Sequence, residues 1–374
     1  MGGPQLKITQ ISAYAVRIPL ARKGTFTRAE RTHADRTIVV LETDTGLRGV
    51  GETRGTGAAD IINTRFAPAL AGQPVADRRA LRRLCIPDAF DHGYPEQLVD
   101  ANAYTAIDLA VWDVTGKAAK MPLHALLGGK VRERAPFVAY DYVVDADKAT
   151  SPAATARAMA DQAEAAIARS GASVFEFKVG VYPLAHDIAA AHAVRDRLGP
   201  DVGIAIDANM GWSADEARTF LTATRDVGFE NVEEPVADLT EMNRLARAFG
   251  VPVSSHCFNL DALKPHDAVT GCVADLHSLG GLEAWRNHAI RAHALGKRPW
   301  FRSVWELGIS WAAMCHFMVA VPEVQRPAQA LFNWIDEDLV LGDKWDVRDG
   351  GVAPPDAPGL GVELDEAALE KFTV

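Results

Sequence analysis

Hydrophobic and polar positions near the start of the chain alternate loosely, as is typical of β-strands. Three such stretches lie at residues 6–19, 36–43 and 47–52. Residues 44–46 (DTG) form a turn between the second and third stretches. From residue 58 the pattern becomes helical, and Ala106, Leu109 and Trp112 recur near helical spacing. Residues 1–134 are therefore predicted to form an α+β module.

Beyond residue 134 the pattern changes to short apolar runs that alternate with helix-compatible segments. The runs lie at residues 137–143, 174–179, 203–207, 231–235, 251–256, 272–277 and 300–304. Repeated strand and helix units of this length predict a parallel sheet, and seven or eight units predict a closed barrel. No GxGxxG or GxxxxGK motif follows a predicted strand, so neither a dinucleotide-binding fold nor a P-loop fold has support. The fold class is α/β, and the predicted catalytic barrel spans residues 135–334.

Composition narrows the range of partners and compartments. The chain has 374 residues, with 39 Lys and Arg against 49 Asp and Glu, and no basic block interleaved with aromatic residues, which disfavours a nucleic-acid partner. No apolar run approaches the roughly 18 residues of a membrane span. The N-terminus lacks a signal-peptide pattern, and the four cysteines have no paired spacing, so we expect a cytoplasmic protein with reduced thiols.

Polar side chains recur at the ends of consecutive predicted strands, where β/α barrels place their catalytic groups. They are Lys178, Asp207, Asn209, Glu233, His256, Asp275, His277 and Arg302. Removing the proton α to a carboxylate is difficult because the product is a dianionic enediolate. A divalent cation held by carboxylates can stabilise that charge, and a lysine with a lowered pKa can act as the base. Asp207 and Glu233 are therefore the predicted metal ligands, and Lys178 is the predicted base.

An ordered set of motifs resembles the enolase superfamily, specifically its mandelate racemase and glucarate dehydratase branch. The motifs include FKVG at 177–180, DANMGW at 207–212, VEEP at 232–235, VPVSSH at 251–256 and DLHSLGG at 275–281. The spacings from Lys178 to Asp207 (29 residues) and from Asp207 to Glu233 (26 residues) are also similar to that family. The resemblance extends over essentially the whole chain.

This resemblance implies a modified TIM barrel, (β/α)7β, capped by an α+β domain that both chain ends build. In this sequence the capping domain would consist of residues 1–134 completed by residues 335–374. Capping loops near residues 25–31 and 52–56 would close over the substrate. The resemblance further implies Mg²⁺ or another divalent cation as cofactor, and a symmetric homo-oligomer.

The sequence departs from the family pattern at three positions. Glu176 replaces the first lysine of the usual strand-end pair. His256 stands where the third metal ligand is usually Glu, Asp or Asn, with Cys257, Asn259 and Asp261 as alternatives if the register differs. An imidazole ligand would move the metal preference from Mg²⁺ toward Mn²⁺ or another softer cation. Arg302 replaces the histidine that normally pairs with the aspartate at the position of Asp275.

Several residues have both a functional and a structural interpretation. Tyr140 and Tyr142 are candidate substrate contacts or ordinary barrel filling, and His277 is a candidate acid catalyst or a plain buried histidine. Arg302 stays protonated, so it suits an anion binder better than a base. Asn209, Glu306 and Arg28 complete the predicted substrate contacts, although Arg28, Arg31 and His33 lie in the expected capping loop and could simply be solvated charges.

The leading functional prediction is a lyase that dehydrates a sugar acid to a 2-keto-3-deoxy acid through metal-dependent abstraction of the α-proton. Racemisation or epimerisation needs a base on each face of the substrate carbon, and the replacement of a histidine by Arg302 removes one. A racemase or epimerase is therefore the alternative. A third possibility is a catalytically silent binding protein of the same fold. The expected partner is a small carboxylate, with no nucleic acid and no membrane.

Overall fold

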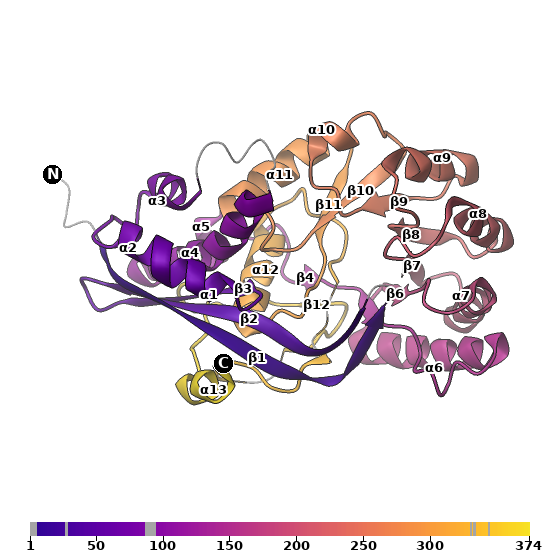
Figure 1. Cartoon of the computed structure of the whole chain (residues 1–374), viewed down its shortest axis with the longest axis horizontal. Helices are drawn as coiled ribbons and strands as arrows, with labels where there is room; N and C mark the ends of the chain where they lie inside the picture. Colours follow the sequence, from indigo (N-terminus) through magenta and orange to yellow (C-terminus); the bar gives the residue numbers. More distant parts are fainter. Residues whose placement is uncertain (1–5, 27–28, 87–94, 330, 332–333, 343–344) are drawn as a thin grey trace.

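The structure is a computed structural model that describes residues 6–26, 29–86, 95–329, 331, 334–342 and 345–374. An antiparallel sheet with its helices forms one end of the molecule, and a parallel sheet surrounded by helices forms the other (Figure 1). Within the described residues, no helix combines the length and the apolar character needed to cross a membrane. The expected domain boundaries at residues 134 and 335 stay a prediction.

The antiparallel sheet confirms the predicted meander. It consists of β1 (Ile8–Phe26), β2 (Ala29–Thr43) and β3 (Arg48–Arg54), in that order. The first two strands are much longer than the alternation predicted. Thr25 pairs with Glu30 after an irregularity between Pro19 and Gly24, so much of the expected capping loop is the paired end of a hairpin. Gly24 lies beside Tyr142, which places this hairpin against the barrel.

Some of the capping helices contact the antiparallel sheet, and the others pack on the longest of them, α4 (Pro95–Ala119). The capping helices are α1 (Ala58–Ile61), the π-helix η1 (Ile62–Phe66), α2 (Ala67–Leu70), α3 (Arg78–Cys85), α4 (Pro95–Ala119) and α5 (Leu123–Leu126). Strand β3 approaches α4 closely because it has glycine at the contact. A Cβ atom on Gly51 would lie 1.8 Å from the carbonyl oxygen of Ala106, so only glycine fits there.

The barrel sheet has seven parallel strands in the order β11-β10-β9-β8-β7-β6-β5. The strands are β5 (Ala139–Asp141), β6 (Val174–Lys178), β7 (Gly203–Asp207), β8 (Phe229–Glu233), β9 (Val253–Ser255), β10 (Val269–Ala274) and β11 (Arg298–Phe301). The helices are α6 (Pro152–Ser170), α7 (Leu184–Leu198), α8 (Ala214–Ala223), α9 (Leu239–Phe249), α10 (Leu260–Leu263), α11 (Leu282–Ala294) and α12 (Gly308–Ala320). This arrangement confirms the predicted modified TIM barrel with an α+β cap.

A short extended segment occupies the eighth position of the barrel. The amide of Val138 donates to the carbonyl of Ala328, and the amide of Gln329 donates to the carbonyl of Phe301. The segment therefore bridges the first and the seventh barrel strands. Strands β4 (Ala135–Pro136) and β12 (Gly351–Val352) pair beside it.

The C-terminal segment returns to the capping sheet. Helix α13 (Glu366–Phe372) packs against β1, and the amide of Val374 donates to the carbonyl of Ala15. Helix α12 is buried along its whole length and contacts both β3 and β4. The C-terminal helix thus lies beside the first strand of the capping sheet (Figure 1).

Candidate active site

The parallel register of the barrel brings three predicted residues together. Lys178 is paired with Asp207 across β6 and β7, and Asp207 is paired with Glu233 across β7 and β8. All three side chains are buried, and the Lys178 ammonium donates to both Asp207 and Asn209. The ends of three adjacent strands therefore place a candidate base beside two carboxylates.

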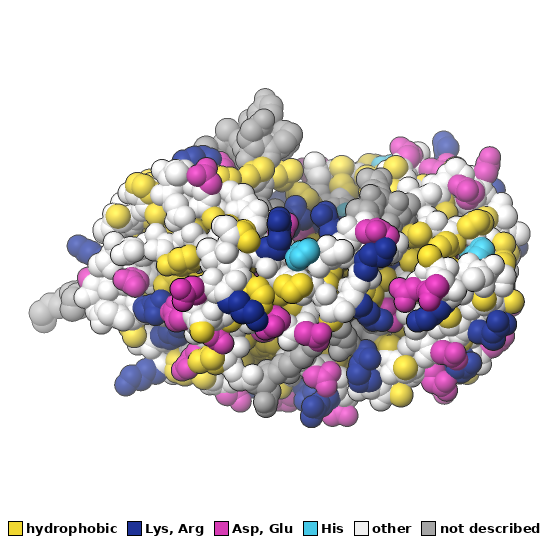
Figure 2. Space-filling model, turned by 60° about the horizontal axis from the view of Figure 1, so that its bottom comes forward, with side chains coloured by type: hydrophobic (Ala, Val, Ile, Leu, Met, Phe, Trp, Pro, Cys, Tyr) yellow, Lys and Arg dark blue, Asp and Glu magenta, His cyan; other side chains and the backbone are white. Residues whose placement is uncertain are grey.

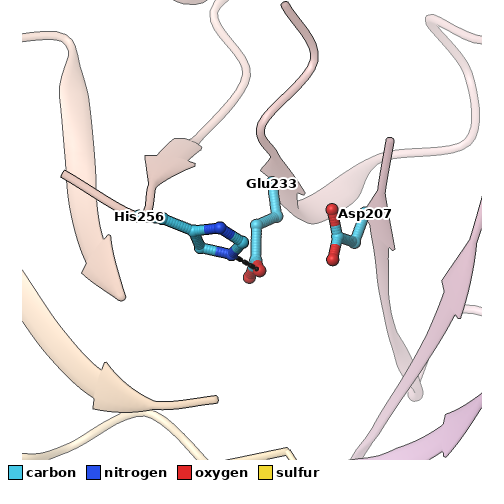
Figure 3. Close-up of side chains that lie close together, drawn as sticks. All are labelled: Asp207, Glu233 and His256. Atoms are coloured by element: carbon cyan, nitrogen blue, oxygen red, sulfur yellow. Dashed lines mark hydrogen bonds and ion pairs between the residues drawn. The ribbon is translucent and has the colours of Figure 1, made fainter. Parts of the chain in front are cut away.

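His256 follows β9 and completes the cluster. Its Nε2 lies 2.7 Å from Oε1 of Glu233, and candidate ligand atoms of Asp207, Glu233 and His256 all lie within 4.8 Å of one another (Figure 3). The alternatives in the neighbouring register have other local roles. Asn259 caps α10 by accepting from the amides of Asp261 and Ala262, and Cys257 donates to the carbonyl of Asn259.

The electrostatics of the two carboxylates fit a divalent cation. Burial and the neighbouring Asp207 raise the pKa of Glu233 to about 8. Burial also acts to raise the pKa of Asp207, but the Lys178 ammonium outweighs it and holds that pKa below its usual value. The positive charge around these two adjacent buried carboxylates does not balance both of them. A divalent cation bound by their hard oxygen atoms would supply the missing charge.

His256 fits the same cation only after a local rearrangement. Nη1 of Arg302 lies 3.1 Å from Nδ1 of His256, and because a guanidinium can only donate, Nδ1 must accept. Nε2 then carries the ring proton and donates to Glu233. A cation on Nε2 would require the proton on Nδ1, so the Arg302 guanidinium would have to leave Nδ1. The carboxylates fit the cation as they stand, whereas His256 fits once Arg302 has moved.

Asp275 holds two guanidinium groups at the edge of the site. Its Oδ2 accepts from Nη1 of Arg54 at 3.0 Å and from Nη2 of Arg302 at 3.1 Å. Burial acts to raise the pKa of Asp275, but the two arginines outweigh it and hold this pKa far below its usual range. The expected arginine partner of Asp275 is therefore present. Asp275 itself does not line the cavity, but it accepts a hydrogen bond from Arg302, which does.

Two further predicted site residues do not line the cavity. The ring of His277 is fully buried, and its Nε2 accepts from Nη2 of Arg36 at 2.7 Å. Burial and Arg36 lower the pKa of His277 far below its usual value, so the ring is neutral. Glu306 accepts from the hydroxyl of Ser303 and the amide of Val304. Neither side chain lines the cavity; the His277 ring holds the Arg36 side chain, and Glu306 fixes the backbone at Val304.

A buried ion pair from the capping sheet supports the same wall. Nε of Arg36 donates to Glu52 at 2.7 Å, and both side chains are fully buried. The Glu52 carboxylate also accepts from the amides of Leu307 and Ser310 at the start of α12, while Arg36 donates to the carbonyl of Val304. Strands β2 and β3 therefore hold the segment between β11 and α12.

The cavity at this site has a volume of about 240 Å³. Its walls include the predicted residues Tyr140, Tyr142, Lys178, Asp207, Asn209, Glu233, His256 and Arg302. Arg28 lies outside the described residues. Sequence reasoning missed Trp305 and Gln329, and it treated Arg31 as solvated charge although Arg31 also lines the cavity. The only available signal was the place of Arg31 in the expected capping loop.

A second cavity, of about 380 Å³, adjoins the first. The two share Arg31, Val304 and Trp305, and the second adds His33 and Arg54. Basic side chains and a histidine gather near the middle of the face shown in Figure 2. The walls of the combined space therefore carry several basic side chains, together with the acid Asp35 in the second cavity.

Comparison with known protein families agrees with this geometry. Residues 10–128 match the mandelate racemase / muconate lactonizing enzyme N-terminal domain, and residues 158–368 match the enolase C-terminal domain-like family. The chain belongs to the enolase superfamily, as its motifs predicted.

Named relatives within this superfamily differ in activity. A Streptomyces coelicolor protein named "Probable glucarate dehydratase" is 31% identical, over 90% of this chain and 84% of that protein. Chloromuconate cycloisomerase of Pseudomonas putida is 26% identical over 98% of this chain and 99% of that enzyme. An N-succinyl-L-Arg/Lys racemase of Bacillus cereus is 27% identical over 99% and 98%. The family is thus established, and the reaction is not fixed by likeness alone.

Solved structures share the whole fold. An enolase from Streptomyces coelicolor superposes with a TM-score of 0.89 at 28% identity, covering 98% of this chain and 96% of that one. An enolase from Pseudomonas fluorescens with bound magnesium, potassium and tartrate superposes with a TM-score of 0.87 at 25% identity, covering 99% and 92%. One relative of this fold therefore binds a divalent cation together with a small dicarboxylate.

Proposed function

We propose that the protein abstracts the proton α to a carboxylate in a metal-dependent reaction and dehydrates a hydroxy acid of the acid-sugar class. The observation behind this proposal is the position of Lys178, whose ammonium lies in the cavity against Asp207 and Asn209, beside the second carboxylate of the cluster. Asp207 and Glu233 would hold the metal, with His256 as third ligand. A bound Mg²⁺ or Mn²⁺ would neutralise charge that develops on the substrate carboxylate.

The chain's own groups then have distinct tasks. Lys178 takes the α-proton at Nζ, and Asn209 orients the amine through its side-chain oxygen. Loss of this α-proton and of the β-hydroxyl amounts to release of one water, and the enol that remains tautomerises to a 2-keto-3-deoxy acid. Tyr140 and Tyr142 are buried at the cavity wall, where they restrict the entry of water.

The positive charge in the two cavities supports a substrate with a second anionic group. Arg302, Arg31 and Arg54 line this space. A guanidinium binds a carboxylate through two parallel hydrogen bonds. The name of the glucarate dehydratase relative and the tartrate in a related structure support a hydroxy diacid.

Racemisation or epimerisation remains the alternative reaction. The racemase name among the relatives supports it, but a second base is then required on the opposite face of the substrate carbon. Arg302 cannot readily accept a proton, and the Asp275 carboxylate is engaged by two arginines. A silent binding protein is the third candidate, and the intact cluster of Lys178, Asp207 and Glu233 opposes it.

The deciding test screens hydroxy mono- and diacids for a 2-keto acid product with Mg²⁺ or Mn²⁺ present. Lys178→Ala should abolish both product formation and α-proton exchange in heavy water. The matched control Lys264→Ala removes an exposed lysine outside the cavity and should keep full activity. Exchange that survives in Lys178→Ala, or equal exchange from two α-epimers, would favour the racemase alternative. A cytoplasmic location and a symmetric homo-oligomer stay predictions.

A further inference from the structure

A separate cavity of about 630 Å³ lies in the seam between the capping helices and the barrel helices. Its walls come from α3 and α4 on the capping side and from α10 and α11 on the barrel side. It shares no lining residue with the active-site cavity. A volume of this size is typical of sites for small organic ligands.

Arginine dominates the wall of this cavity. Five arginines line it: Arg78, Arg79, Arg82, Arg83 and Arg291. Three carboxylates oppose them: Asp108, Asp261 and Glu283. Glu283 is already paired with Arg79 at 3.0 Å, and Asp108 accepts from the amide of Leu282. The chain as a whole has a formal net charge of −10, so this local excess of positive charge runs against its composition.

The stability of helix α3 does not explain its arginines. Its sequence is RRALRRLC, with four arginines in eight residues. Arg78 and Arg79 stand in the first turn, where the helix dipole disfavours cations. Arg78 with Arg82, and Arg79 with Arg83, form like-charge pairs at a spacing of four residues, which also destabilises a helix. A ligand of opposite charge would explain the cluster.

Arg78 is held in an orientation suited to such a ligand. Its guanidinium carbon lies 3.8 Å from the centre of the Trp112 ring, so the planar group is stacked and restrained. Within the part of the chain that the structure describes, its side chain forms no ion pair, and its buried Nε has no hydrogen-bond partner. A restrained guanidinium fork is the usual receptor for phosphate and carboxylate groups.

We propose that this cavity binds a small organic polyanion through Arg78 and Arg291. Phosphate and carboxylate groups share the required chemistry, and Phe258 and Leu279 provide an apolar wall for the rest of the molecule. Because the cavity spans both parts of the protein, the ligand would link the cap to the barrel and stabilise their docking.

The test measures binding of pyrophosphate and of citrate by calorimetry at fixed ionic strength, without substrate or divalent cation. It is therefore independent of the proposed reaction. The wild-type protein should bind one of the two with a stoichiometry of one. Tighter binding of pyrophosphate would identify a phosphate ligand, and tighter binding of citrate a polycarboxylate. Arg78→Gln and Arg291→Gln should each weaken binding about tenfold or more, because each removes a charge-assisted contact.

Two controls separate this site from other sources of binding. Arg286→Gln makes the same charge change on an exposed position of α11 outside the cavity, and it should leave affinity within about twofold. Arg302→Gln tests the active-site cavity. The proposal is overturned if neither anion binds up to about 10 mM, if Arg286→Gln weakens binding as much as Arg78→Gln, or if only Arg302→Gln abolishes it. Circular dichroism of each variant would exclude loss of fold as the cause.

Discussion

Arg326 neutralises a buried acid at the centre of the barrel, and its replacement by methionine gives the most quantitative prediction. Glu176 is fully buried and accepts from Nη2 of Arg326 at 3.0 Å and from the side chain of Gln329 at 2.5 Å. Arg326 also forms an ion pair with Glu230 at 3.1 Å and lies over the ring of Trp300 at 4.3 Å. Glu176 stands where the family pattern has a lysine, so this position carries an acid in place of a base. The positive charge that balances the buried acid comes from Arg326.

The loss of stability caused by Arg326→Met should increase with pH. Burial raises the pKa of Glu176 to about 7, although Arg326 acts to lower it. Without Arg326 this pKa rises further. Below about pH 7 the folded proteins both hold Glu176 protonated, so Arg326→Met loses its contacts with Trp300 and its ion pair with Glu230, or about 1 to 2 kcal/mol. Above pH 7 the variant loses about 1.4 kcal/mol more for each pH unit, until Glu176 ionises in the variant as well.

Urea unfolding of metal-free protein at pH 6 and pH 9 measures this difference. We expect Arg326→Met to reduce the free energy of unfolding by about 1 to 2 kcal/mol at pH 6 and by about 3 to 5 kcal/mol at pH 9. Adding Glu176→Gln should remove the pH dependence, because it removes the titrating group. Arg348→Met, at an exposed position, should change little at either pH. A loss equal at both pH values, or a double variant with the pH dependence of the single one, would refute the reasoning.

Three further predictions concern the metal site, a buried acid and the cap. Asp207→Asn should weaken binding of Mg²⁺ or Mn²⁺ by tenfold or more in calorimetry, and unchanged affinity would contradict the ligand assignment. Burial raises the pKa of Asp187 to about 7, so the wild type should lose stability as pH rises from about 4 to 7. Asp187→Asn keeps an acceptor for Gly180 and Trp212, and it should gain at most about 4 kcal/mol at pH 8 and flatten that profile in thermal or urea unfolding. Gly51→Ala should reduce the free energy of unfolding by about 3 kcal/mol, and a stable, normally folded variant would show that β3 can move away from α4.

Much of the barrel could be predicted because each of its strands is a short apolar run followed by a helix. The parallel register then brings strand ends together, which is why Lys178, Asp207 and Glu233 were found correctly as neighbours. The prediction for His277 had no such support. Strand β10 ends at Ala274, and a turn follows in which the amide of Ser278 donates to the carbonyl of Asp275, so strand alternation no longer sets the direction of His277.

Other features of the site depend on contacts that no local pattern records. Gln329 belongs to an eighth barrel position with a single short bridge, which leaves no apolar run to detect. Arg36 and Glu52 pair with each other within the capping sheet. Both also bond to backbone groups that lie more than 250 residues further along the chain, and no local pattern indicates those contacts. The length of the β1 and β2 hairpin was missed because its outer part is polar and docks on the barrel.

The closing segment of the barrel has a consequence for the order in which the protein is made. A ribosome releases the acids Glu176, Asp207 and Glu233 long before it releases Arg326 and Gln329. Until those last residues arrive, the emerging half-barrel would have to bury Glu176 without its partners. We therefore expect the nascent barrel to stay open until the C-terminal third is synthesised, so that metal capture follows folding of the full chain.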